Sequence, residues 1–198
     1  MSDNKKKLDY KPVLVLTLIV TITALVLIIA ERGIRTDENT LGGVLGEKCI
    51  LLMGDGEFEI VLDWLEAGYT IERPKEIAKL IINTDNNTIA FQVITKGYNK
   101  DGLNILVVMN EDGSVRDLEV VKNSETPQIG TKVNERSFLE NFIGQSKDVR
   151  IVKAQPRNAG EVAGITGATK SARGVADAVN IAISTYAELF NAEGVEDN

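Results

Sequence analysis

The chain has no histidine and only one cysteine, and these two scarcities exclude several kinds of redox and hydrolytic centre. A c-type haem needs a Cys-x-x-Cys-His run, and zinc sites and iron–sulfur clusters need several Cys or His ligands. A Ser-His-Asp triad is likewise impossible. If the protein carries electrons, an organic cofactor is therefore the most economical carrier. Cys49 cannot form an internal disulfide, and its role, as a buried apolar residue or as a metal or thiol group, stays open.

Basic residues are also in the minority, with 22 Lys and Arg against 29 Asp and Glu, for a formal net charge of −7. Nucleic-acid phosphates require basic patches, so this balance argues against a nucleic-acid partner. The acidity itself mainly favours solubility. With 198 residues, 43% of them hydrophobic and 26% charged, the chain is long enough for one folded domain with a core.

One long apolar run lies near the start of the chain. Residues 13–30 are 18 consecutive uncharged residues, which as a helix cover roughly 27 Å, close to the hydrocarbon thickness of a bilayer. A cleaved signal peptide has a shorter apolar core and a small-x-small cleavage site, and a buried core helix has a polar face. We therefore predict a single transmembrane anchor at 13–30. By the positive-inside rule, the lysines before it place residues 1–12 in the cytoplasm. The anchor then lies in the cell (inner) membrane, and the residues after 30 lie on its outer side.

Residues 31–84 are predicted to form a polar connector followed by the first part of the outer domain. Within it, residues 74–82 have the pattern of a short helix. A proline suits the first turn, and Ile77, Leu80 and Ile81 fall on one helical face.

Residues 85–191 are predicted to hold the rest of the domain, with 192–198 as a tail. Runs rich in Asn, Asp and Gly separate short apolar segments, which predicts an antiparallel meander. An amphipathic pattern near the end predicts a long helix. The fold class is therefore α+β, with an antiparallel sheet and flanking helices. The predicted elements are strands at 88–96, 103–109, 115–121 and 149–153, and helices at 137–143 and 169–191.

The entry to the last helix is a Thr-Gly-Ala-Thr run at residues 166–169. Either threonine can cap the helix, and Gly167 allows a tight turn and the close approach of a ligand. The first-turn amides and the helix dipole, with Lys170 and Arg173 on one face, would make a phosphate cradle. A plain helix cap has the same local features, so these residues alone leave both interpretations open.

A second segment, residues 122–130, follows the third strand and contains Pro and Gly, which predicts a loop. Its backbone amides, threonine hydroxyl and carboxylate suit the polar edge of a heterocycle, and Ile129 suits its face. An ordinary turn fixed by Pro127 explains the same residues.

Taken together, the two segments resemble the FMN-binding domain that is shared by the G subunits of Rnf electron-transport complexes and the C subunits of sodium-pumping NADH:quinone reductases. The later run resembles the family's Ser/Thr-Gly-Ala-Thr flavinylation motif, and the earlier one its Glu-Thr-Pro-Gly-Leu-Gly loop. Gly97-Tyr98 before an apolar strand, Asp112-Gly113 and the N-terminal anchor fit the same pattern. The two runs read Glu125-Thr126-Pro127-Gln128-Ile129-Gly130 and Thr166-Gly167-Ala168-Thr169.

The resemblance implies an α+β domain that holds FMN, attached by a separate flavin transferase through a phosphoester bond to the hydroxyl of Thr169. It implies no catalytic residue and no metal ligand. The attachment loop is implied to be shaped by Thr166, Gly167 and Ala168, beside Lys170. The isoalloxazine or its ribityl chain is implied to lie against Glu125, Thr126, Pro127, Ile129 and Gly130.

Two positions depart from the family pattern. Ala163 stands where the family usually has an Asp, three positions before the motif, and Gln128 stands where the loop usually has a Gly. The functional hypothesis is an electron-relaying subunit of an Rnf-type complex that couples ferredoxin and NAD to sodium or proton movement, incomplete without its other membrane subunits. The alternatives are the C-type subunit of a sodium-pumping quinone reductase, which is usually longer, and an anchored scaffold module without a cofactor.

Overall fold

The structure is a computed structural model that describes residues 16–17, 20–21, 23–24 and 41–190. The chain divides into two units, Met1–Thr40 and Leu41–Asn198. Most of the predicted anchor, the connector up to residue 40 and the tail lie outside the described residues. Within the described part, no helix has both the length and the apolar character needed to cross a membrane.

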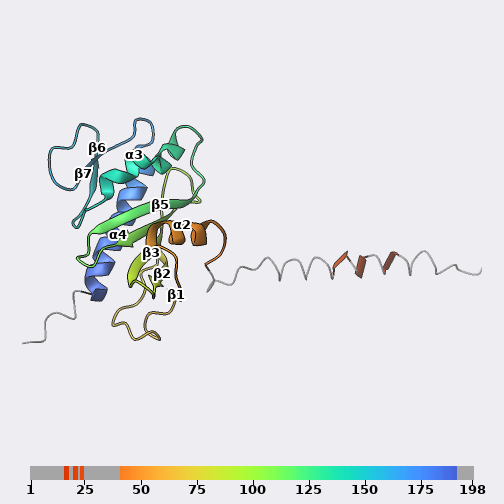
Figure 1. Ribbon diagram of the computed structural model, residues 1–198. Coiled ribbons are helices and arrows are strands. Elements are labelled where there is room, and N and C mark those ends of the chain that lie inside the picture. The colour runs from red at the N-terminus through yellow and green to blue at the C-terminus, as the bar shows by residue number, and fades with distance from the viewer. Residues whose placement is uncertain (1–15, 18–19, 22, 25–40, 191–198) are drawn as a thin grey trace, which may run out of the picture. The chain divides into compact units, whose positions relative to one another are not determined.

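A five-stranded antiparallel sheet forms the centre of the second unit (Figure 1). Each strand pairs with the next one along the chain, which confirms the predicted meander and extends it by two strands at its N-terminal edge. The strands are β1 Phe58–Val61, β2 Ile77–Asn83, β3 Thr88–Thr95, β4 Leu103–Met109 and β5 Val115–Asn123.

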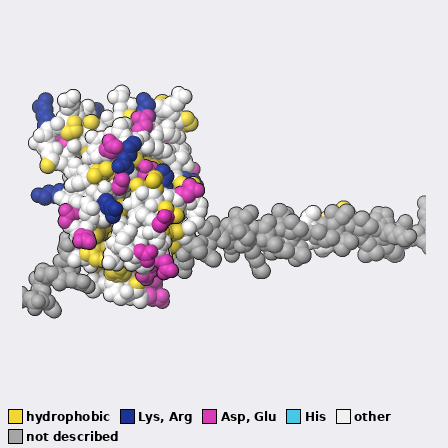
Figure 2. All heavy atoms as spheres, viewed as in Figure 1, with side chains coloured by type: hydrophobic (Ala, Val, Ile, Leu, Met, Phe, Trp, Pro, Cys, Tyr) yellow, Lys and Arg dark blue, Asp and Glu magenta, His cyan; other side chains and the backbone are white. Residues whose placement is uncertain are grey.

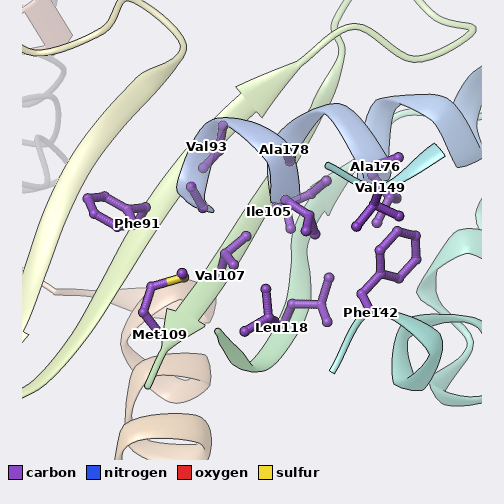
Figure 3. Close-up of a cluster of buried hydrophobic side chains, with 14 of the residues drawn as sticks. Phe91, Val93, Ile105, Val107, Met109, Leu118, Phe142, Val149, Ala176 and Ala178 are labelled. Carbon is purple, nitrogen blue, oxygen red and sulfur yellow. The ribbon is translucent and has the colours of Figure 1, made fainter. Parts of the chain in front are cut away.

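One face of the sheet is covered by helix α4, Thr169–Phe190, at the place where the sequence predicts a long helix. Successive side chains of a strand point to opposite faces, so alternate residues of β3 and β4 meet this helix. Figure 3 shows Phe91, Val93, Ile105 and Val107 in this layer, with Ala178 of α4. The apolar side chains that recur along one face of this helix are all buried: Val175, Val179, Ala182, Tyr186 and Leu189.

The other face is partly covered by helix α2, Gly43–Met53. Leu45, Cys49 and Met53 of α2 form a second buried cluster with sheet residues that include Leu106 and Val108. Burial raises the pKa of the Cys49 thiol to about 11, so Cys49 acts here as a small apolar core residue. Because both faces of the central strands are covered, the sequence of β4 is a nearly continuous apolar run.

The predicted helix at 74–82 is wrong, because this segment forms strand β2. The pairing of β2 with β3 shifts register between Ile77 and Lys79, as at a β-bulge. The extra residue puts Ile77 and Leu80 in the α4 cluster, although they are three positions apart. Ile81 then faces α2 on the opposite side. The bulge and the two covered faces together imitate the spacing of a helix.

The remaining elements lie between the sheet and α4 in sequence. The predicted helix at 137–143 is confirmed as α3, Arg136–Leu139, followed by the 3-10 turn η2, Glu140–Phe142, with its aromatic and leucine side chains buried. Another 3-10 turn, η1, spans Gly130–Asn134. The predicted strand at 149–153 is confirmed as β6, Arg150–Val152, which pairs in parallel with a strand that was not predicted, β7, Glu161–Ala163.

Candidate functional site

Residues 164–168, here called the attachment loop, lead from β7 into α4. The first three residues of the Thr-Gly-Ala-Thr run lie in this loop, and the last one, Thr169, opens the helix. Gly167 has a φ of +82°, a conformation that residues with side chains rarely adopt. The amide of Ala168 donates to the carbonyl of Ile165, with an N···O distance of 3.0 Å. Helix α4 then begins at Thr169, whose side chain is half-buried. The hydroxyl therefore stands at the positive end of a helix of 22 residues.

A cavity of about 260 Å³ opens beside Thr169. Its apolar wall comes from β6 and the attachment loop, and its polar groups are two threonine hydroxyls and two cations. The lining consists of Ile151, Val152, Lys153, Gly164, Ile165, Thr166, Gly167, Thr169 and Arg173. Three of the residues that the resemblance singled out, Thr166, Gly167 and Thr169, thus share one cavity.

The other two members of the predicted attachment set lie outside that lining. Ala168 is 4% exposed. Lys170 lies on the outside, with its ammonium 5.4 Å from the centre of the Tyr98 ring. This cation–π contact joins the start of α4 to the Gly97-Tyr98 segment that the resemblance also includes.

The second loop, predicted at residues 122–130, starts two residues later in the structure because β5 extends to Asn123. Residues 124–130 are here called the Glu125 loop. The carbonyl of Thr126 accepts hydrogen bonds from three following amides, those of residues 129, 130 and 131, at 2.9–3.3 Å. Gln128 has a φ of +62°, which explains why a glycine suits this position in related loops. Thr126, Pro127 and Ile129 are exposed, whereas Glu125 and Gly130 are buried.

Tertiary structure brings the two loops together. A Cβ placed on Gly167 would lie 3.5 Å from Cγ2 of Ile129. The hydroxyl of Ser171, in the first turn of α4, donates to Oε2 of Glu125 at 2.7 Å. The Glu125 loop therefore contacts the attachment loop and the start of α4, although its own residues do not line the cavity of about 260 Å³.

Some residues of this region are not singled out as site residues by the sequence. Lys153 and the two β6 residues Ile151 and Val152 reach the cavity because β6 pairs in parallel with β7. The sequence predicts a strand there, but a three-residue parallel pair carries no sequence signal of its partner. In the sequence Ser171 is simply part of the helix that follows the motif. Only its hydrogen bond with Glu125 shows that it belongs to the contact between the two motif segments.

Charge is unevenly distributed over the second unit. Residues 150–173 contain five basic residues and one acidic one, whereas residues 41–76 contain eight acidic and three basic ones. On the face in Figure 2, Lys and Arg gather in the upper part, where β6 and β7 lie, and Asp and Glu in the lower part, near β1 and β2. The cavity thus lies in a locally positive part of an acidic chain, which suits an anionic ligand.

The single acidic residue of that basic stretch, Glu161, is already engaged. Its carboxylate accepts from the backbone amide of Arg157, from the side-chain amide of Asn158 and from the guanidinium of Arg150. These hydrogen bonds lower the pKa of Glu161 from 4.5 to about 2. On α4, burial raises the pKa of Asp177, and nearby Arg173 acts against that rise.

Two larger cavities lie away from the motifs. One, of about 500 Å³, is lined by residues that include Asn86, Asn110, Arg116 and Tyr186, and the other, of about 460 Å³, lies beside the middle of α4. Size alone therefore does not point to the predicted site. We favour the smaller cavity, because it combines the motif hydroxyls with cations and an apolar wall.

Among the described residues, no group of three or more His, Cys, Asp or Glu could hold a metal ion.

The donor set of the smaller cavity fits a flavin phosphate. Lys153 and Arg173 offer positive charge and hydrogen bonds to a phosphate, and Thr169 lines the cavity at the positive end of α4. Ile151, Val152 and Ile165 offer an apolar surface for the flat part of a ligand. Gly167 bears no side chain that would block the approach to Thr169.

Comparison with known proteins finds a domain family, two sequence relatives and a shared fold. Residues 97–184 match the FMN-binding domain. This stretch of the chain contains both motif loops, and the match confirms the resemblance that the motifs indicate. The FMN-binding domain match begins at Gly97, beside the buried Glu125, and ends within α4.

Two curated proteins are similar in sequence, and both are G subunits. The chain is 26% identical over 126 residues to that of the Na(+)-translocating ferredoxin:NAD(+) oxidoreductase complex of Acetobacterium woodii, covering 60% of each chain. It is 32% identical over 100 residues to that of the proton-translocating ferredoxin:NAD(+) oxidoreductase complex of Clostridium ljungdahlii, covering 50% of this chain and 54% of that one. The matches thus span little more than half the length of these relatives.

A solved structure shares the fold. The C subunit of the Na(+)-translocating NADH-quinone reductase from Parabacteroides distasonis superposes with a TM-score of 0.53 at 19% identity, covering 78% of this chain and 84% of that one. At this identity the likeness shows the α+β fold alone, with its antiparallel sheet and flanking helices.

Proposed function

We propose that the protein is the G-type subunit of an Rnf-type ferredoxin:NAD oxidoreductase complex and relays electrons through FMN bound covalently to Thr169. The observation that carries the proposal is the position of the Thr-Gly-Ala-Thr run. It lines a cavity with cations and an apolar wall, within a stretch that matches the FMN-binding domain. The sequence relatives are G subunits of such complexes, which supports the choice of complex.

Bound FMN would supply reversible one- and two-electron chemistry, and the chain's residues would hold and orient it. Arg173 and Lys153 would neutralise the phosphate at the positive end of α4. Ile151, Val152 and Ile165 would pack on the apolar part of the ligand and keep water from it.

Attachment requires that Oγ1 of Thr169 form a bond to the flavin phosphorus. The hydroxyl proton passes to a base of the flavin transferase. The donor is a flavin linked through a pyrophosphate, whose P–O bond breaks and releases a nucleoside monophosphate. Thr169 suits this step because its side chain is half-buried, held by the helix and still open to the cavity.

The proposal includes the membrane anchor at 13–30, with the flavin domain on the extracytoplasmic side. The apolar run and the four lysines before it support this topology. The partners would be the other membrane subunits of the complex and, during maturation, the flavin transferase. In this proposal the subunit relays electrons and the translocation of sodium or protons belongs to the assembled complex.

Covalent attachment is tested by co-expressing the full chain with a flavin transferase and viewing a denaturing gel under ultraviolet light. We expect a fluorescent band from the wild type and from Thr166→Ala, the matched control in the same cavity, and none from Thr169→Ala. No band from the wild type would contradict covalent FMN, and a colourless purified protein would favour the cofactor-free scaffold. A band from Thr169→Ala would contradict the assigned residue.

The type of complex is tested on the native membrane assembly. Removal of this subunit should abolish electron transfer between ferredoxin and NAD while leaving NADH:quinone reductase activity unchanged. The opposite result would identify the chain as a C-type subunit of a sodium-pumping quinone reductase, the alternative that the shared fold also accommodates.

A further inference from the structure

A buried hydrogen bond joins the Glu125 loop to the first turn of α4. Ser171 is 1% exposed and Glu125 is 4% exposed, and they come from positions 46 residues apart in the chain. The Ser171 hydroxyl donates to Oε2 of Glu125 at 2.7 Å, and the backbone amide of Asn99 donates to Oε1 at 3.1 Å. Both oxygens of the carboxylate are therefore paired inside the protein.

The backbone encloses this carboxylate closely. A Cβ on Gly97 would clash with Oε1 of Glu125, and a Cβ on Gly130 would lie 2.9 Å from Oε2. Only glycine allows the two segments to approach in this way. Glu125 thus faces Ser171 and Asn99 from within a glycine cradle and offers almost no surface to a ligand.

We propose that Glu125 and Ser171 are positioning residues that lock the first turn of α4, which carries Thr169, against the Glu125 loop, rather than contacts of the flavin. As it concerns the flavin, the inference rests on the proposed function. Ser171 lies two residues after Thr169, in the first turn of α4, so a fixed Ser171 fixes the backbone that carries the Thr169 hydroxyl. The Glu125–Ser171 hydrogen bond is here called the latch.

The first turn of a helix needs such a partner because its amides lack intrahelical acceptors and its backbone frays. A second contact holds the next turn: the Thr95 hydroxyl donates to the carbonyl of Gly174 at 2.7 Å. A Cβ on Gly174 would lie 2.6 Å from the carbonyl oxygen of Lys96, so glycine is needed for this turn of the helix to lie so close to the end of β3. With the latch, the start of α4 is tied to the sheet and to the Glu125 loop, and Thr169 is presented in one position.

The latch also separates the hydroxyls of this region by role. Thr166 and Thr169 are accessible from the cavity, whereas the Ser171 hydroxyl is buried and occupied by a carboxylate. Ser171 is therefore not a second attachment point, although it lies two residues from the first.

The test compares Ser171→Ala with Ser184→Ala in the full chain without flavin, followed by hydrogen–deuterium exchange of a peptide covering 164–173. Ser184 is the matched control, because it lies on the same helix, is exposed and bonds only the carbonyl of Ile181 in its own helix. We expect Ser171→Ala to speed exchange in 164–170 on the order of tenfold, the effect of losing a hydrogen bond to a charged group. Glu125→Gln, which keeps one acceptor oxygen, should give a smaller increase. The exchange free energy lost in the double variant should be smaller than the sum of the losses in the two single variants, because both changes act on the same hydrogen bond.

With flavin transferase present, Ser171→Ala should take up flavin more slowly than Ser184→Ala, and the visible circular dichroism of the attached flavin should change. Equal exchange and equal flavin uptake in the two serine variants would overturn the inference that the latch positions Thr169. If Ser171→Ala does not fold, Glu125→Gln decides, and wild-type exchange in that variant overturns the inference. A wild-type chain that takes up no flavin would contradict the proposed function. The exchange measurement would still show whether the latch orders the start of α4.

Discussion

The two loops at the candidate site lie side by side but are held in different ways. The Glu125 loop is anchored from within: one carbonyl accepts three amides, and a buried carboxylate is bound from two other segments. The attachment loop is exposed at Thr166 and Gly167 and leads out of the two-stranded β6–β7 pair. The difference teaches that one loop can fix the start of α4 in place while the Thr166 and Thr169 hydroxyls remain open to the cavity.

The largest effect is expected from Gly97→Ala, which breaks the anchored loop. The new Cβ would clash with Oε1 of Glu125 and lie 3.3 Å from Leu103 Cγ, so the carboxylate must leave its partners. We expect a loss of about 3 kcal/mol in the free energy of unfolding, measured by urea denaturation. In a Glu125→Ala background the same change should cost much less, because the clashing atom is gone. Simple additivity of the two changes would contradict the glycine cradle.

The stability of the protein should depend on pH through Glu161, which lies at the base of the attachment loop. Its pKa is lowered from 4.5 to about 2 by the hydrogen bonds it accepts. A lowered folded-state pKa gives stability that is fully present above pH 4.5 and is lost as the pH falls through 2. We expect Glu161→Gln to remove this part of the pH dependence of Tm. Glu188→Gln, an exposed position on α4, should leave it unchanged.

A smaller effect of opposite sign is expected at Gln128, whose φ of +62° is strained for a residue with a side chain. Gln128→Gly should relieve a cost of about 1–2 kcal/mol and lose about 0.5–1 kcal/mol through the freer unfolded chain. The net gain is about 0.5 kcal/mol, measurable by urea denaturation. Asn87→Gly, at a φ of +54°, is the control and should gain less, since Asn tolerates this conformation. A loss of stability in Gln128→Gly would show that the side chain itself holds the loop.

The smallest effect is expected where the start of α4 meets Tyr98. Lys170 lies 5.4 Å from the centre of the exposed Tyr98 ring. A double-mutant cycle with Lys170→Met and Tyr98→Leu should give a coupling of about 0.5 kcal/mol, as for an exposed cation–π pair. Lys170→Met alone should leave the exchange of the latch region near the wild-type rate. A coupling of several kcal/mol would mean that this contact, rather than the latch, orders the loop.

Much of the sheet follows from local pattern. The strand at 103–109 has the predicted bounds, because a strand buried on both faces is a short apolar run closed by turn residues. Helix α4 follows from its periodic apolar face. The segment at 74–82 misleads because a bulge shifts the register by one residue, and nothing in a helical count of apolar positions reveals a bulge.

For the site, sequence alone determined the chemistry that is available: the hydroxyl pair of 166–169, the glycine between them, and the resemblance that the match to the FMN-binding domain confirms. Only the tertiary structure decided which groups share the space. It brought Lys153 and β6 to the cavity through a parallel pairing, and it turned Glu125 toward Ser171. The physical reason is that local patterns report the preferences of one segment, whereas a buried carboxylate takes its partners from segments far away in the chain.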